Sequence, residues 1–396
     1  MSNRIKTGLD RLTENSKLLL NLGNKVAYLG HEASVTARLE PGHLIINELI
    51  GNRLDRLFGP QHGFSTLDQD NMIETSHQVH PSLGIPVYSL YSSARQPSPE
   101  MLNGLDTLII DLQDVGTRVY TYIWTLYLIM ESCRQRNIRI LVLDRPNPID
   151  GLTIEGNLPQ TAWYSFVCMA QIPMRHGLSI GEMALLFNQE FNNEVNLEVV
   201  PMTGWERSMH WDDTGLPWVN PSPNLPTPSG ALVYPGSVLI EGTEFSEGRG
   251  TTRSLELFGH PELDPFSLSP LLNKELSKAG LSGFVLRPTF FKPTFQKHMG
   301  KVCGGFQFHC TNRDEFEPWK LMQHSLRILY HEQNLEKFWH TNPYEYETKG
   351  LGIDFINGST SIRNWIESNG SSKELIELEI NGQTEFEEKR KEKLIY

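Results

Sequence analysis

The first 150 residues alternate short apolar runs with helical patterns, and this alternation limits the fold more than any other feature of the chain. The apolar runs are rich in β-branched residues and span residues 25–29, 54–58, 85–91, 106–112 and 138–143. Near-continuous apolar strands separated by helices are typical of a parallel sheet that is covered on both faces. The sequence therefore predicts an α/β fold for this part of the chain.

A proline-rich segment predicts where one domain ends and the next begins. At 396 residues the chain is long enough for two or three domains. Four of the eight residues in 221–228 are proline, which cannot continue a helix or a central strand. We therefore place the boundary near residue 230 and predict domains at 24–230 and 231–396. The second domain is predicted to be α+β because it mixes strands with helices, at 283–286, 306–310, 319–332 and 375–380.

Charge and cysteine content exclude several classes of protein. The chain has 47 acidic and 35 basic residues, a formal net charge of −12. Nucleic acids and anionic membranes bind clustered cations, so we expect neither as a partner. The four cysteines are too sparse for a disulfide framework and are interpreted as reduced, structural thiols. We expect a cytoplasmic protein, because no signal-peptide pattern and no bilayer-spanning apolar stretch is visible.

Dense polar loops follow directly on the predicted strands. In doubly wound sheets ligands bind at the carboxyl edge, where such loops converge. The loop 111–122 holds two carboxylates, a guanidinium and two phenols, from Asp111, Asp114, Arg118, Tyr120 and Tyr122. Ionised carboxylates and flat aromatic faces suit a polar, ring-shaped ligand such as a sugar. In the alternative, structural interpretation, Asp114 caps the following helix and Arg118 pairs with Asp111.

A second polar loop, residues 241–252, combines three glycines with three glutamates and one arginine: Glu241, Glu244, Glu247 and Arg249. It lacks the Gly-Lys-Ser/Thr of a phosphate loop, and its glutamates would repel phosphate. Acids on a flexible backbone suit acid/base work or contacts with sugar hydroxyls. A structural turn explains the segment equally well.

Three polar residues lie near the start of a predicted helix that ends near residue 191. Ser179 and Glu182 have capping-box spacing, so Glu182 is interpreted as a cap. His176 is either a proton carrier or a hydrogen-bonded structural residue. The closest histidines, His77 and His80, match no metal-ligand pattern, so we expect no metal.

Several of these segments occur together and in a fixed order. They are LFGPQHG at 57–63, IPVYSL at 85–90, DLQDVGTRVYTY at 111–122, LDRPNP at 143–148, PMRHG at 173–177, PSPN at 221–224, EGT at 241–243 and SEGRGT at 246–251. In this combination the chain resembles the exo-β-N-acetylmuramidase (NamZ) family. The resemblance implies a Rossmann-like parallel-sheet domain, then a smaller α+β domain, with the active site in the cleft between them. It also implies a glycosidase, without a cofactor, that releases N-acetylmuramic acid from non-reducing ends of peptidoglycan fragments.

Gln61 and Glu244 depart from the pattern of that family. The family usually has glutamate at the first position, its leading catalytic candidate, and asparagine at the second. An amide cannot donate a proton as a carboxylic acid does. Either another acid acts here, or the 2-acetamido group of the substrate is the nucleophile and Gln61 orients it, or the chain binds another ligand. The alternative function is a non-catalytic or re-purposed saccharide-binding protein on the same scaffold.

The resemblance implies roles for the residues within these motifs. Glycoside cleavage needs an acid for the leaving oxygen and a second group for the oxocarbenium-like centre. The catalytic candidates are Gln61, His62, Asp111, Asp114, Glu244 and Glu247. Muramic acid also carries a lactyl carboxylate, which suits a guanidinium. The candidates for substrate binding are Arg118, Tyr120, Tyr122, Asp144, Arg145, Asn147, Arg175, His176, Glu241 and Arg249. We expect the segments 61–63, 111–122 and 244–249 to border one groove that binds a small saccharide.

Overall fold

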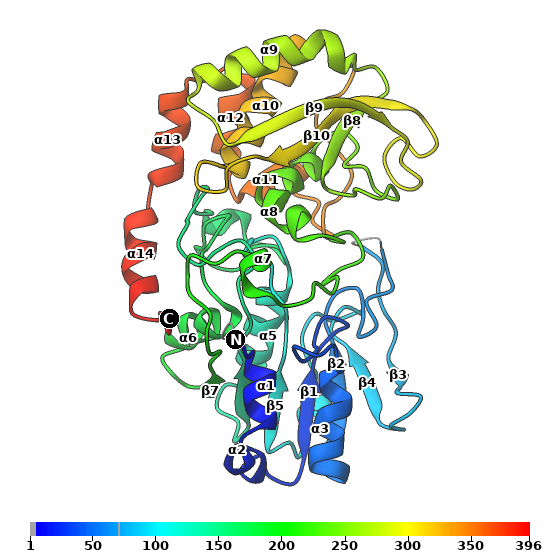
Figure 1. Cartoon of the computed structure of the whole chain (residues 1–396), viewed down its shortest axis with the longest axis vertical. Coiled ribbons are helices and arrows are strands. Elements are labelled where there is room, and N and C mark those ends of the chain that lie inside the picture. The colour runs from blue at the N-terminus through cyan, green and yellow to red at the C-terminus, as the bar shows by residue number, and fades with distance from the viewer. Residues whose placement is uncertain (1–4, 70–71, 334) are drawn as a thin grey trace.

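A mostly parallel sheet forms the centre of the N-terminal half, as predicted (Figure 1). The computed structural model describes residues 5–69, 72–333 and 335–396. Within these residues the sheet has seven strands in the order β3-β4-β2-β1-β5-β6-β7. β3 is antiparallel to β4, and the other neighbouring pairs are parallel. The strands are β1 (Val26–Leu29), β2 (Leu54–Gly59), β3 (Gln78–Val79), β4 (Pro86–Ser89), β5 (Thr107–Ile110), β6 (Arg139–Leu143) and β7 (Asn196–Val200).

Helices cover both faces of this sheet, because successive side chains of a strand point to opposite faces. Val26 and Tyr28 of β1 pack in the core beneath α1 (Gly8–Thr13) and α3 (Gly42–Ile50). Ala27 and Leu29 belong to the core on the other face, with α5 and α6. The bounds of α5 and α6 are Tyr122–Cys133 and Ile180–Glu190. The other helices of this half are α2 (Ser16–Leu20), α4 (Pro99–Leu102), α7 (Trp211–Thr214), η1 (Gly51–Arg53) and η2 (Thr161–Trp163).

The C-terminal half has its own antiparallel sheet, with the strand order β8-β10-β9. Figure 1 shows this half stacked on the end of the N-terminal sheet from which the long loops emerge. The core around α5 and α6 continues into it through Phe258 and Trp319, so the two halves share one apolar interior. Its elements are β8 (Leu257–His260), β9 (Phe284–Phe291), β10 (Cys303–Cys310), α8 (Pro228–Ser237), η3 (Val238–Gly242), α9 (Pro265–Lys278), α10 (Pro318–Glu332), α11 (Gly352–Asn357) and α12 (Thr360–Glu367).

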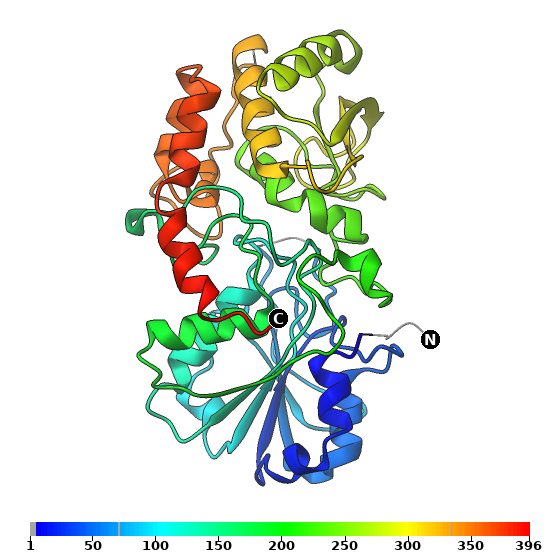
Figure 2. The same ribbon diagram turned by 60° about the vertical axis from the view of Figure 1, so that its left-hand side comes forward.

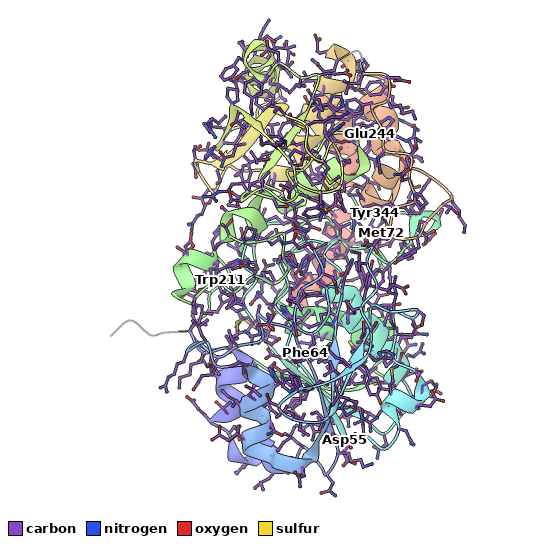
Figure 3. All side chains as sticks on the ribbon, turned by 90° about the vertical axis from the view of Figure 1, so that its right-hand side faces the viewer. Asp55, Phe64, Met72, Trp211, Glu244 and Tyr344 are labelled. Carbon is purple, nitrogen blue, oxygen red and sulfur yellow. The ribbon has the colours of Figure 1, made fainter. Side chains whose placement is uncertain are left out.

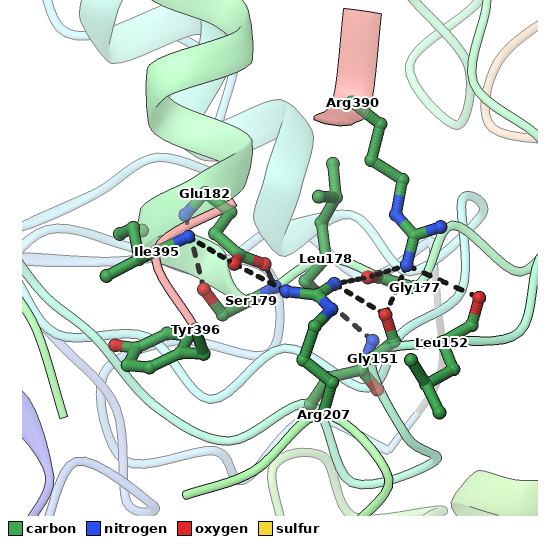
Figure 4. Close-up of polar contacts among 12 residues, drawn as sticks. Gly151, Leu152, Gly177, Leu178, Ser179, Glu182, Arg207, Arg390, Ile395 and Tyr396 are labelled. Carbon is green, nitrogen blue, oxygen red and sulfur yellow. Dashed lines mark hydrogen bonds and ion pairs between the residues drawn. The ribbon is translucent and has the colours of Figure 1, made fainter. Parts of the chain in front are cut away.

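The last segment of the chain returns to the N-terminal half. Figures 1 and 2 show α13 (Ser372–Ile380) and α14 (Gln383–Lys391) running along one side of the molecule toward α6. There the backbone N–H of Ile395 donates to Glu182 at 2.9 Å, and the Tyr396 hydroxyl donates to Asp144 at 2.6 Å. Figure 4 shows the surrounding contacts, in which the Arg390 guanidinium donates to the carbonyl of Gly177 at 3.0 Å. The C-terminus therefore fastens the two halves together.

The predicted strands and helices are confirmed, with differences at their ends. All five strands expected in the first 150 residues are present, and the capping box of Ser179 and Glu182 forms as predicted. The helix that follows the loop 111–122 begins at Tyr122, because Gly116 has φ +78° and the chain turns before the helix starts. β7 was not predicted: its side chains are mostly half-exposed or exposed, so it lacks the apolar run of a buried strand.

The structure also bears on two expectations from composition. All four cysteines are free thiols, and three of them are buried. In the part of the chain that the structure describes, no helix has the length and apolar character needed to cross a membrane.

Candidate functional site

A pocket lies where the carboxyl edge of the N-terminal sheet meets the C-terminal half. It has an empty volume of about 500 Å³, part of which is open to solvent. Its lining comes from several stretches that lie far apart in the chain, and polar and aromatic residues dominate it: Gln61, His62, Tyr120, Thr121, Tyr122, Ser222, Asn224, Tyr234, Glu241, Arg249, Tyr344 and Glu345. Each of the segments 61–63, 111–122 and 244–249 reaches this pocket as expected, through Gln61 and His62, residues 119–122 and Arg249.

The local fold explains why these side chains reach the pocket. Gln61 and His62 follow the end of β2, and His62 has a left-handed backbone with φ +70°. The His62 ring nitrogen Nδ1 lies 2.6 Å from the carbonyl oxygen of Asp68, which fixes the ring. Tyr120 and Tyr122 follow β5, with ring centroids 4.7 Å apart in an edge-to-face arrangement. The Tyr122 hydroxyl donates to the carbonyl of Pro221 at 2.6 Å. The proline-rich segment 221–228 therefore contributes a wall of the pocket.

Gln61 contacts a carboxyl group from the other half of the molecule. Its Oε1 accepts a hydrogen bond from the Thr121 hydroxyl at 2.6 Å, and its Nε2 donates to Oε1 of Glu345 at 3.3 Å. The Tyr91 hydroxyl donates to Oε2 of Glu345 at 2.6 Å. Burial raises the pKa of Glu345 to about 7, although the bonds from Tyr91 and Gln61 oppose that shift. The pocket thus holds a carboxyl group that carries a proton for much of the time near neutral pH.

The loop that carries Glu345 is anchored to the N-terminal half. The Tyr346 hydroxyl donates to the carbonyl of Met72 at 2.9 Å, and Figure 3 shows Met72 beside Tyr344 where the halves meet. The Arg95 guanidinium lies 3.9 Å above the Tyr91 ring and 4.9 Å from the ring centroid of Tyr346. Glu345 itself has a left-handed backbone with φ +46°. A side chain rarely adopts this conformation unless its surroundings enforce it.

A buried ion network also borders the pocket, through Arg249 and Glu241. The Arg249 guanidinium contacts Glu241 through Nη2 and Glu247 through Nε, each at 2.6 Å. Lys297 Nζ lies 3.0 Å from Oε2 of Glu247, and the Tyr344 hydroxyl donates to Oε2 of Glu241 at 2.9 Å. Burial raises the pKa of Glu241. For Glu247 burial acts in the same direction, but the charges of Lys297 and Arg249 outweigh it and lower the pKa to about 2. Glu247 is therefore a permanent anion that orients Arg249.

Comparison with known proteins assigns the chain to a family. A model for the N-terminal part of exo-β-N-acetylmuramidase NamZ matches residues 26–229, and a model for its C-terminal part matches residues 232–396. The chain belongs to the NamZ family. It is 40% identical to the peptidoglycan β-N-acetylmuramidase NamZ of Bacillus subtilis, over 99% of this chain and 92% of that protein.

Two solved structures from Bacteroides fragilis share the fold of this NamZ family member. Both are described as DUF1343 family proteins. One is 30% identical with a TM-score of 0.85, and the other is 24% identical with a TM-score of 0.77. Each alignment covers 99% of this chain and 99% of the other. The two-part α/β architecture is therefore shared along the whole length.

Two predicted acids of this NamZ family member, Asp111 and Asp114, do not line the pocket. Asp111 is fully buried, where its carboxylate contacts the Arg145 guanidinium at 2.5 and 3.0 Å and accepts from the Tyr28 hydroxyl at 2.5 Å. Asp114 accepts from the N–H of Gly116 at 2.7 Å, within the turn. Its Oδ2 also lies 3.2 Å from Nε2 of His176. The structural interpretation of the loop 111–122 is wrong in its details, because Asp114 caps no helix and Arg118 does not pair with Asp111.

The other predicted residues outside the lining have structural partners. Arg118 donates to the carbonyls of Asn157, Ile172 and Ile356 at 2.8 to 2.9 Å, which ties the two halves together. Asp144 accepts from the N–H of Gly181 at the start of α6. Asn147 contacts the backbone of Leu178 and Ile149, Arg175 contacts Asp150 at 2.6 Å, and the half-exposed Glu244 lies 2.9 Å from His340.

Sequence reasoning missed several residues of the pocket, above all Glu345. Thr121, Tyr234 and Tyr344 also line it, and Tyr91 contacts it through Glu345. Glu345 lies in a loop without regular periodicity, 284 positions from Gln61. The one local signal was the aromatic pair Tyr344 and Tyr346 on either side of the glutamate.

Proposed function

We propose that this protein is an exo-acting glycosidase that releases N-acetylmuramic acid from the non-reducing end of peptidoglycan fragments. Membership of the NamZ family supports this activity, as does the similarity to the Bacillus subtilis peptidoglycan β-N-acetylmuramidase over 99% of the chain. The observation that carries the proposal is the pocket itself. It combines aromatic faces, a protonatable carboxyl group and a guanidinium, which are the groups that a charged amino sugar requires.

The form of the pocket favours the end of a saccharide. Tyr120, Tyr234 and Tyr344 offer aromatic surface on which a sugar ring packs, while Glu241 and Asn224 offer polar contacts for hydroxyl groups. Because residues from both halves close around it, the pocket suits a terminal unit better than a unit within a chain. We therefore propose exo action rather than internal cleavage.

Arg249 is our candidate for recognition of the lactyl carboxylate. It lines the pocket, and Glu241 and Glu247 hold its guanidinium from two directions. An arginine whose orientation is already fixed loses little side-chain entropy when a carboxylate binds. We propose that this contact separates N-acetylmuramic acid from N-acetylglucosamine, which lacks the lactyl group.

The test uses the disaccharide N-acetylmuramyl-β-1,4-N-acetylglucosamine and follows free N-acetylmuramic acid by chromatography. We expect stoichiometric release of both sugars. The control is the disaccharide of two N-acetylglucosamine units, which we expect to remain intact. Binding of the first disaccharide without release would instead support a saccharide-binding protein, and the absence of both binding and release would contradict the proposal.

A further inference from the structure

With Gln61 at this position, the pocket needs another residue as proton donor. A sugar alkoxide is a poor leaving group, so glycoside cleavage needs a proton donor beside the bridging oxygen. The amide of Gln61 cannot supply that proton, yet Gln61 donates a hydrogen bond to another carboxyl group in the pocket lining. We infer that Glu345 is the general acid of this protein and that Gln61 and Tyr91 position it. The inference rests on the proposed function and names the residue that carries its first step.

The geometry supports this role in three ways. Glu345 lines the pocket, although only 6% of the residue is exposed to solvent. Hydrogen bonds from Gln61 and Tyr91 hold one carboxyl oxygen each, at 3.3 and 2.6 Å. The left-handed backbone of Glu345 is a conformation that folded proteins tend to maintain at functional sites. The carboxyl group is therefore fixed in the position from which a donor would act.

The electrostatic surroundings suit a group that must hold a proton near neutral pH. Burial raises the pKa of Glu345 to about 7, and the negative charge of Glu241 acts in the same direction. The Arg95 guanidinium and the hydrogen bonds from Tyr91 and Gln61 oppose that shift. The other ionisable groups in or beside the pocket are His62, Tyr120, Tyr122, Tyr234, Glu247, Arg249, Lys297, Tyr344 and Tyr346.

The proposed step balances with water as the second reactant. The carboxyl proton of Glu345 passes to the bridging oxygen while the bond between that oxygen and the anomeric carbon breaks. The oxygen of a water molecule then forms a bond to the anomeric carbon. The proton that this water releases restores the acid form of Glu345. The products are N-acetylmuramic acid and the shortened saccharide, with no oxidant or other co-reactant.

The first test compares Glu345→Gln with Glu347→Gln. Glu347 lies two residues further along the same loop, is partly exposed and does not line the pocket. With the muramyl disaccharide, we expect kcat to fall by at least about 100-fold in Glu345→Gln, the usual scale for losing a general acid. We expect Glu347→Gln to keep the wild-type rate. The wild-type kcat/KM, which reports groups of the free enzyme, should decline on the alkaline side with an apparent pKa near 7, and this decline should vanish in Glu345→Gln.

A second substrate separates a proton donor from a structural residue. The 4-nitrophenyl β-glycoside of N-acetylmuramic acid has a leaving group that departs without protonation. We expect Glu345→Gln to lose less than about 10-fold on it, because the missing proton is not needed there. An equal loss on both substrates would overturn the inference, since a merely structural residue would affect them alike.

An exchange variant tests the pairing of the two side chains. Gln61→Glu combined with Glu345→Gln keeps one carboxyl and one amide in contact but exchanges their positions. We expect it to recover at least about 10-fold of the activity that Glu345→Gln loses; no recovery would contradict the inferred pairing of Gln61 with Glu345. Wild-type activity with less than threefold loss in Glu345→Gln would overturn the inference alone. Inactivity of the wild type would overturn the proposed function and this inference with it.

Discussion

Replacement of Asp111 by asparagine tests whether this buried acid stabilises the fold or performs chemistry. The sequence made Asp111 a catalytic candidate, whereas the structure buries it completely against Arg145. Asparagine keeps the size of the side chain but removes its charge, so Arg145 is left buried beside a neutral partner. Removal of one member of a buried ion pair costs about 3 to 5 kcal/mol. We therefore expect Asp111→Asn to lower stability and to leave the chemistry of the folded protein intact.

The size of the effect follows from the unfolding entropy. That entropy is about 2.1 cal/mol/K per residue, or about 0.8 kcal/mol/K for the whole chain and about half that for the N-terminal half alone. A loss of 4 kcal/mol then lowers the melting temperature by about 5 °C if the chain unfolds as one unit. The shift grows to about 9 °C if the N-terminal half unfolds by itself.

The assay is differential scanning calorimetry, with kcat measured on the same sample well below the transition. The control is Glu14→Gln, which breaks a pair between Lys6 and Glu14 whose side chains are 50% and 58% exposed. An exposed pair contributes below about 1 kcal/mol, so we expect a change of about 1 °C or less. A large loss of kcat in Asp111→Asn with an unchanged melting temperature would refute the reasoning.

Three further predictions concern stability elsewhere in the molecule. Burial raises the pKa of Glu155 from 4.5 to about 8, so ionisation weakens the folded state as the pH rises between these values. Glu155→Gln should therefore gain melting temperature relative to wild type at pH 8.5, and this gain should shrink toward pH 5. Tyr396→Phe removes hydrogen bonds to Asp144 and from the Met202 N–H, at 2.6 and 2.7 Å; it should cost about 1 to 3 kcal/mol in urea unfolding. Gly236→Ala would place a Cβ 2.0 Å from the Pro318 carbonyl oxygen, so α8 and α10 must separate and the melting temperature should fall.

Much of the fold follows from local order in the sequence. The run at 138–143 predicts a strand because its apolar residues are contiguous, and β6 occupies residues 139–143. The loop after the run at 106–112 was expected at the site, and Tyr120 and Tyr122 lie there. Such features depend on neighbouring residues and on the fact that the carboxyl ends of parallel strands lie at the same edge of the sheet. Both are visible in a single sequence.

The partners of charged residues follow from tertiary contacts instead. Asp111 and Arg145 each follow a strand, and the sequence placed both in the site. The fold pairs them with each other, 34 positions apart, so that neither lines the pocket. Glu345 shows the opposite case, because nothing near it in the sequence indicates that it meets Gln61. A ligand-binding charge and a structural charge look alike in sequence when the partner lies far along the chain.

The most direct test of the account is a crystal structure of Glu345→Gln soaked with the muramyl disaccharide. The variant should bind the substrate without cleaving it. The account predicts density for the muramyl ring between Tyr120 and Arg249, with the bridging oxygen within hydrogen-bond distance of the side chain at position 345. An intact disaccharide bound outside this pocket, or one whose bridging oxygen lies far from that side chain, would contradict it.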